Sequence, residues 1–75
     1  MFSANDLARV RVPVAEHDHN GMLRTWKPTT ILRVLHTSPD GEVVLVDDSR
    51  GLRVKLHTGR LAMHRRAEHT NDKGN

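Results

Sequence analysis

The sequence predicts an all-β protein built as a small five-stranded barrel. Several short segments alternate apolar and polar residues with a period of two, which is typical of strands with one buried face. Turn sequences separate these segments, and no window carries a helical apolar stripe for more than two turns. The chain has 75 residues, so we expect one domain. A chain this short gains from closing its sheet, because open edges invite pairing with other chains.

The first predicted strand covers residues 7–14, LARVRVPV. Alternation places its apolar residues on one side, namely Ala8, Val10, Val12 and Val14. Arg9 and Arg11 then lie on the opposite, outer side. Pro13 indicates a strand end or a sheet edge, because proline cannot donate to a ladder.

A polar segment, AEHDHNG at residues 15–21, predicts the tip of a hairpin. Its last two residues are Asn-Gly, a strong hairpin signal because both residue types tolerate positive φ. Residues 22–26, MLRTW, run back as a partner strand until Pro28 interrupts them. An alternative to the barrel uses the same residues: the first strand pairs with MLRTW in a separate two-stranded ribbon.

Tight turns, SPDG and DSRG, join three further predicted strands, at residues 29–37, 42–47 and 52–57. Gly41 closes the first turn, and we expect Gly51 to be left-handed in a bulged hairpin. Residues 60–66 form either a last short strand or a helical turn. We assign residues 1–66 to a single domain and the polar residues 67–75 to a flexible tail.

This order of elements is similar to that of the SH3-like small barrels, including the KOW and Tudor kinds. A strand is followed by a longer excursion, then by three strands joined by tight turns, then by a short turn and a final strand. The resemblance covers residues 7 to about 65. It rests on architecture, so it implies a fold and assigns no functional residue. A Sm-like or OB-like barrel is the alternative.

The composition favours a binding protein over an enzyme. The net charge is +3, and nine of the twelve cationic residues are arginine, whose planar fork suits phosphates and carboxylates. There is no cysteine, no phosphate-binding glycine loop and no nucleophile–base constellation. We therefore expect no catalytic residue and no cofactor. No apolar run is long enough to cross a bilayer, which predicts a soluble, cytoplasmic protein without a membrane partner.

Cationic residues on the outer side of the predicted strands are the main candidate site. They are Arg9, Arg11, Arg33, Arg53 and Lys55, extended at the C-terminal end by Arg60, Arg65 and Arg66. They converge if their strands are neighbours in the sheet, and a phosphate backbone would be drawn to such a face. The alternative is a solvated strand face, which every soluble sheet needs.

Trp26 is one of only two aromatic residues. It either fills one mouth of the barrel or is an exposed anchor for a protein partner. So few aromatics argue against base stacking, and they favour contacts with a nucleic-acid backbone or with a protein. If the partner is a protein, we expect residues 15–27 to dock on a larger complex, with Arg24 and Lys27 among the contacting residues. The chain would then be an adaptor or inhibitor, such as a phage or plasmid regulator of a polymerase or nuclease.

His17 and His19 form an H-x-H pair that resembles part of a zinc or copper site. The spacing of the other histidines indicates no further ligands, and Asp and Asn side chains commonly stabilise turns. We therefore prefer the hairpin tip and predict no metal.

We predict a non-enzymatic binding module. Nucleic acid held by the arginine face is the preferred partner, and a larger protein complex is the alternative. The chain is expected to be a monomer or a small homo-oligomer.

Overall fold

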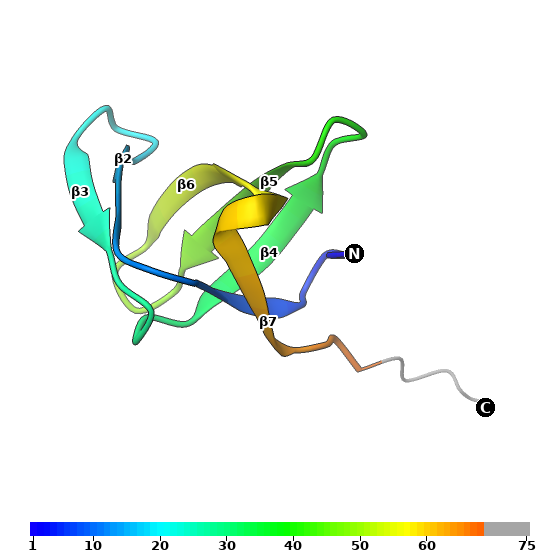
Figure 1. The fold of residues 1–75 in the computed structure, drawn as a ribbon. Helices are drawn as coiled ribbons and strands as arrows, with labels where there is room; N and C mark the ends of the chain where they lie inside the picture. Colours follow the sequence, from blue (N-terminus) through cyan, green and yellow to red (C-terminus); the bar gives the residue numbers. More distant parts are fainter. Residues whose placement is uncertain (69–75) are drawn as a thin grey trace.

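The computed structural model describes residues 1–68, which form two antiparallel sheets (Figure 1). The elements are β1 (Leu7–Val10), β2 (Val14–His17), β3 (Leu23–Trp26), β4 (Leu32–Thr37), β5 (Glu42–Asp47), β6 (Leu52–His57), the 3₁₀ turn η1 (Thr58–Arg60) and β7 (Leu61–Arg65). The large sheet has the order β6-β5-β4-β1-β7, and β2 pairs with β3 in the small one. Among these residues, no helix has the length and apolar character needed to cross a membrane.

The protein is all-β, but residues 1–68 do not form the closed barrel that the sequence predicted. β6 and β7 follow one another in the chain, yet they lie at opposite edges of the large sheet. Between them η1 carries the chain from one edge to the other (Figure 1). The sheet is thus open between its two edge strands.

The predicted strand at residues 7–14 is divided between the two sheets. β1 ends at Val10, the chain leaves the ladder through Arg11 to Pro13, and β2 begins at Val14. Val12, expected inside, is 63% exposed. β2 pairs with β3, from Val14 opposite Trp26 to His17 opposite Leu23. Within the predicted segment the ribbon alternative therefore holds for Val14 alone, and Ala15 to His17, predicted as part of the hairpin tip, complete the strand that pairs with β3.

The segments after the hairpin agree more closely with the elements predicted from the sequence. β5 and β6 have the predicted bounds, β4 begins three residues later than predicted, and residues 61–65 form a strand. Both predicted turns are present. The N–H of Gly41 donates to the carbonyl of Ser38 at 3.1 Å, and Gly51 is left-handed with φ of 67°.

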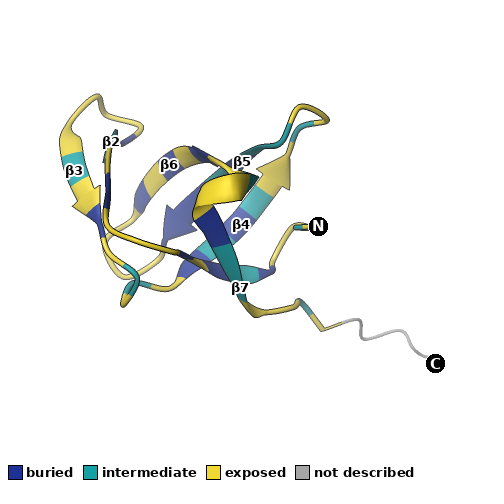
Figure 2. Ribbon diagram, viewed as in Figure 1, coloured by how far each residue is buried: buried dark blue, intermediate teal, exposed yellow. Residues whose placement is uncertain are grey.

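The core lies on one face of the large sheet and beneath the small sheet (Figure 2). It consists of Ala8, Val10, Val14, Trp26, Leu32, Val34, Val43, Leu45, Leu52, Val54, Leu56 and Leu61, with Phe2 packed against it. β6 shows the predicted alternation without exception, because its leucines and valine are buried and its polar residues are exposed. The opposite, outer face of the large sheet carries most of the cationic candidates.

The first six residues are tied to the sheet. The N–H of Asn5 donates to Val34, and the N–H of Val34 donates to the carbonyl of Asp6. The buried Asp6 carboxylate accepts the N–H of Ser3 at 2.8 Å and that of Ala67 at 2.7 Å. Ala67, predicted to begin a flexible tail, is therefore anchored beside β7. The rest of the predicted tail beyond Glu68 lies outside the described residues.

Candidate functional site

One row of residues in register crosses the whole outer face of the large sheet. Arg33 is opposite Val46 on one side and Leu7 on the other; Val46 then pairs with Arg53, and Leu7 with Arg65. From β6 to β7 the order is therefore cation, apolar, cation, apolar, cation. Because neighbouring strands lie about 4.8 Å apart, the cationic Cα atoms are spaced by about 10 Å.

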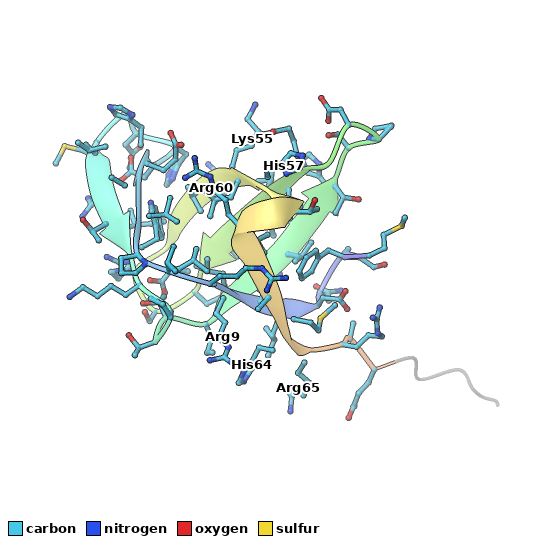
Figure 3. The ribbon with its side chains drawn as sticks, in the orientation of Figure 1. Arg9, Lys55, His57, Arg60, His64 and Arg65 are labelled. Carbon is cyan, nitrogen blue, oxygen red and sulfur yellow. The ribbon has the colours of Figure 1, made fainter. Side chains whose placement is uncertain are left out.

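Four arginines gather at the β4–β1–β7 side of this row, and we call them the β1–β7 arginine cluster: Arg9, Arg33, Arg65 and Arg66. A hollow of about 330 Å³ is lined by Asn5, Leu7, Arg33, Arg65, Arg66, Ala67 and Glu68. Arg9 lies two residues from Leu7 on the same strand face. Figure 3 shows Arg9 and Arg65 on one side of the molecule, together with His64. Glu68 is the one carboxylate among the lining residues.

Arg53 and Lys55 lie at the other edge of the sheet, apart from this cluster. Figure 3 shows Lys55 beside His57, on the opposite side of the molecule from Arg9. A groove of about 520 Å³ separates β6 from the hairpin and is lined by Glu16, His17, Asp18, His19, Glu42, Val44, Arg53, Val54 and Lys55. Carboxylates and cations are mixed there. The structure thus divides the predicted arginine face into two surfaces of different charge.

Arg11 and Arg60 lie next to each other at the start of β7. The N–H of Arg11 donates to the carbonyl of Arg60 at 3.0 Å, which extends the pairing of β1 with β7 by one residue. Both are exposed, but neither lines the hollow of the cluster. The hydrogen bond between their backbones holds the chain beside β1 where it enters β7.

Three arginines are neutralised by ion pairs. Arg24 contacts Asp18 at 2.6 Å, Arg50 contacts Asp47 at 2.6 Å, and Arg33 contacts Asp48 at 2.9 Å. Arg24, predicted as a partner contact, therefore stabilises the hairpin. Within residues 1–68 no ion pair is formed by the other cations: Arg9, Arg11, Lys27, Arg53, Lys55, Arg60, Arg65 and Arg66.

Trp26 is not an exposed anchor, so the hypothesis of docking through this side chain is wrong. Its exposed fraction is 0%, and its indole N–H donates to the carbonyl of Glu16 at 3.1 Å. The Arg50 guanidinium lies over the ring, 5.3 Å from its centroid. Trp26 instead joins the hairpin to the core. Lys27, the next residue, is exposed.

The segment around Asp18 is a hairpin turn. The Asp18 carboxylate accepts the N–H groups of Asn20 and Met22 at 2.8 and 3.1 Å, and Gly21 is left-handed with φ of 81°. The Arg24 guanidinium lowers the pKa of Asp18 to about 2, and the two N–H groups act in the same direction, against the effect of burial. The preferred interpretation of AEHDHNG as a hairpin tip is thus confirmed for residues 18–21, which Asp18 organises, whereas residues 15–17 belong to β2.

His19 attaches this turn to the edge of β6. Its N–H donates to the carbonyl of Arg53 at 2.9 Å, and its ring Nδ1 accepts the N–H of Arg53 at 3.0 Å. The imidazole takes the place that a carbonyl would have in a strand ladder. Within residues 1–68 no group of three or more His, Asp or Glu side chains is placed to hold a metal ion. His17 is the last residue of β2, and His19 joins the turn to β6.

The Asp18–Arg24 pair makes acid sensitivity a testable property of the hairpin. Between pH 3.8, the ordinary pKa, and about 2, the folded state binds fewer protons at Asp18 than the unfolded state. The contribution of Asp18 to stability is therefore present above this range and is lost as the pH falls through it. We expect urea unfolding at a series of acidic pH values to show this loss, and D18N to flatten the profile while lowering stability at neutral pH. The E42Q variant controls for removal of one carboxyl, and a D18N profile as steep as the wild type would contradict the assignment.

Two residues of the candidate surface were missed from the sequence. Leu7 is the apolar centre between Arg33 and Arg65, and Asp48 pairs with Arg33 from the β5–β6 turn. Asp47 is buried and Asp48 is exposed, because adjacent residues at the end of a strand point to opposite faces. A scan against protein-family models found no match for the chain, and neither did searches of curated proteins and of solved structures.

Proposed function

We propose that this protein is a non-enzymatic module that binds nucleic acid through its phosphates at the β1–β7 arginine cluster. The observation that supports this best is the position of Arg33 and Arg65 on either side of Leu7, with Arg66 lining the same hollow. Cationic groups about 10 Å apart reinforce each other's potential at ionic strengths of about 0.1 M or below, where the Debye length is about 10 Å or more. Arginine forks bind phosphate oxygens in a bidentate manner. The cluster therefore has the charge and donors for a polyanion.

The aromatic residues favour contacts with the backbone over contacts with bases. Proteins that bind single strands stack bases on exposed aromatic rings. Within residues 1–68, Trp26 is fully buried and Phe2 is packed against the core. The surface of the cluster thus offers cations without stacking platforms. A duplex, whose phosphates are outermost, is the suitable ligand.

The fold that we propose for this module is an open relative of the SH3-like small barrels. The strand order β6-β5-β4-β1-β7 supports this, as does the long excursion that carries the small sheet between β1 and β4. A single 3₁₀ turn links β6 to β7. In this plan the cluster lies on the outer surface of β4, β1 and β7.

Binding of a short DNA duplex of mixed sequence at increasing salt tests the proposed function. Arg9, Arg65 and Arg66 make no ion pair within residues 1–68, so we expect about three phosphate contacts. The logarithm of the association constant should then fall with the logarithm of salt concentration with a slope of about −2.7. A single strand of the same length should bind no more tightly. Absence of binding at about 50 mM salt, or a slope near zero, would overturn the proposal.

A protein partner is the second candidate, because the groove between the hairpin and β6 offers mixed charges. Glu16 and Glu42 line it together with Arg53 and Lys55. In this case the chain acts as an adaptor or inhibitor of a larger complex such as a polymerase or nuclease. A purified complex that survives nuclease and moderate salt, and is lost in R53A/K55A but kept in R9A/R65A, would favour this candidate over the first.

A further inference from the structure

We propose that Asp48 is an internal competitor for phosphate that withholds Arg33 from the ligand. This inference rests on the proposed function. It assigns a regulatory role to a carboxylate that borders the cluster. In the free protein Asp48 occupies the fork of Arg33 that a phosphate would use, so the wild-type cluster binds with three of its four arginines.

The contact between Asp48 and Arg33 is bidentate. Nε of Arg33 donates to Oδ2 of Asp48, and Nη2 donates to Oδ1, both at 2.9 Å. This is the geometry in which guanidinium groups bind carboxylates and phosphates alike. The hydrogen bonds from Arg33 lower the pKa of Asp48, and those bonds with the charge of Asp48 raise the pKa of Arg33. Both groups are therefore charged over the whole physiological range.

Arg33 borders two hollows on the outer face, and Asp48 borders only one of them. One hollow is that of the cluster, which Arg33 shares with Arg65 and Arg66. The other, of about 460 Å³, is lined by Leu7, Thr29, Thr30, Ile31, Arg33, Asp47, Asp48, Ser49 and Arg50. Pairing with Asp48 therefore directs the Arg33 guanidinium towards the second hollow. Release from Asp48 would make it available to a ligand bound beside Arg65.

The turn between β5 and β6 does not depend on the Asp48 side chain. Asp47 makes the side-chain hydrogen bonds of this turn, accepting the N–H and hydroxyl of Ser49 and the Nε–H of Arg50. Within residues 1–68, Arg33 is the one hydrogen-bond partner of the Asp48 side chain. The two paired side chains are 37% and 61% exposed, and such pairs contribute little to folding stability. Removing the charge of Asp48 should thus change binding and leave the fold intact.

The experiment compares D48N with D40N, which removes one carboxyl from the exposed turn at the other end of β5. We expect D48N to bind the DNA duplex about three- to tenfold more tightly than wild type. Its salt slope should become steeper by about 0.9, the value for one additional phosphate contact. D40N should keep the wild-type slope, and R33A/D48N should return to it. Thermal unfolding monitored by circular dichroism checks that each variant is folded.

The possible results separate this inference from the proposed function. If wild type binds and D48N behaves as D40N does, Asp48 acts only through net charge and the inference is wrong while the proposed function remains. If neither wild type nor D48N binds, the proposed function fails, and the inference fails with it. Binding by D48N alone would show that Asp48 withholds Arg33 as inferred, but it would overturn the proposed function of the wild-type chain.

Discussion

Replacement of Trp26 by alanine is expected to lower the free energy of unfolding by about 3–5 kcal/mol. Truncation of a buried tryptophan costs about 3–5 kcal/mol, because the lost transfer free energy adds to the cost of the cavity. A folded chain of this length is stable by roughly 4–11 kcal/mol. The substitution therefore removes a large share of the total.

The position of Trp26 explains why neighbouring side chains cannot compensate for the loss of its ring. The ring is fully buried and belongs to the same cluster as residues of both sheets. Opposite it on β2, Val14 is the other core residue that the hairpin contributes. Within residues 1–68 the one other aromatic side chain is Phe2, at the periphery of the core. Loss of the indole thus opens the contact between the hairpin and the large sheet.

W26F is the matched control, since it keeps an aromatic ring and loses the hydrogen bond to the carbonyl of Glu16. It should be destabilised by about 1–2 kcal/mol, much less than W26A. Urea unfolding followed by far-ultraviolet circular dichroism measures both, because tryptophan fluorescence is lost in each variant. A W26A protein as stable as wild type but defective in partner binding would show that the side chain is an exposed anchor after all.

The segments predicted well from the sequence are those whose structure is decided locally. β6 alternates without interruption, β5 is a short apolar run, and the turn between them carries a glycine at its left-handed position, Gly51. The turn before β5 is closed by the Ser38–Gly41 hydrogen bond that its sequence predicts. Such hairpins need no information from the rest of the chain, because the turn type fixes the register.

The division of the first strand could not be predicted in the same way. Val10, Val12 and Val14 keep one phase of alternation, so a continuous strand explains them as well as two strands do. Pro13 signalled an end, but the decision depends on the partners available: β1 lies between β4 and β7, whereas β2 pairs only with β3. The gap between the edge strands β6 and β7 could not be predicted for a similar reason, because it depends on where η1 carries the chain.

The sequence predicted the residue types of the candidate site. It predicted their arrangement in space only in part. Alternation identified Arg9, Arg33 and Arg53 as outward facing, but it does not show which strands are adjacent. The register puts Arg33 and Arg65 on either side of Leu7 and moves Arg53 to the far edge. The ion pair of Arg33 with Asp48 could not be predicted from the sequence either. The two residues are distant in sequence and meet only through the pairing of β4 with β5.

The double substitution R9A/R65A is expected to weaken binding of the DNA duplex about thirtyfold, if each arginine contributes about 1 kcal/mol. The salt slope should become shallower by about 1.8, the value for two lost phosphate contacts. Both side chains are exposed and make no ion pair within residues 1–68, so the substitutions remove charge without opening the core. Fluorescence anisotropy of the labelled duplex at several salt concentrations measures both quantities.

R53A/K55A is the control that decides whether position or charge is responsible. It removes the same two positive charges from β6, at the other edge of the sheet, and leaves the backbone contacts of Arg53 with His19 in place. A site at the cluster predicts a slope close to that of wild type for this variant. Equal losses in the two variants would indicate diffuse attraction by net charge, and a larger loss in R53A/K55A would place the ligand in the groove beside the hairpin. Because both variants carry the same net charge, a difference between them can arise only from where the ligand contacts the sheet.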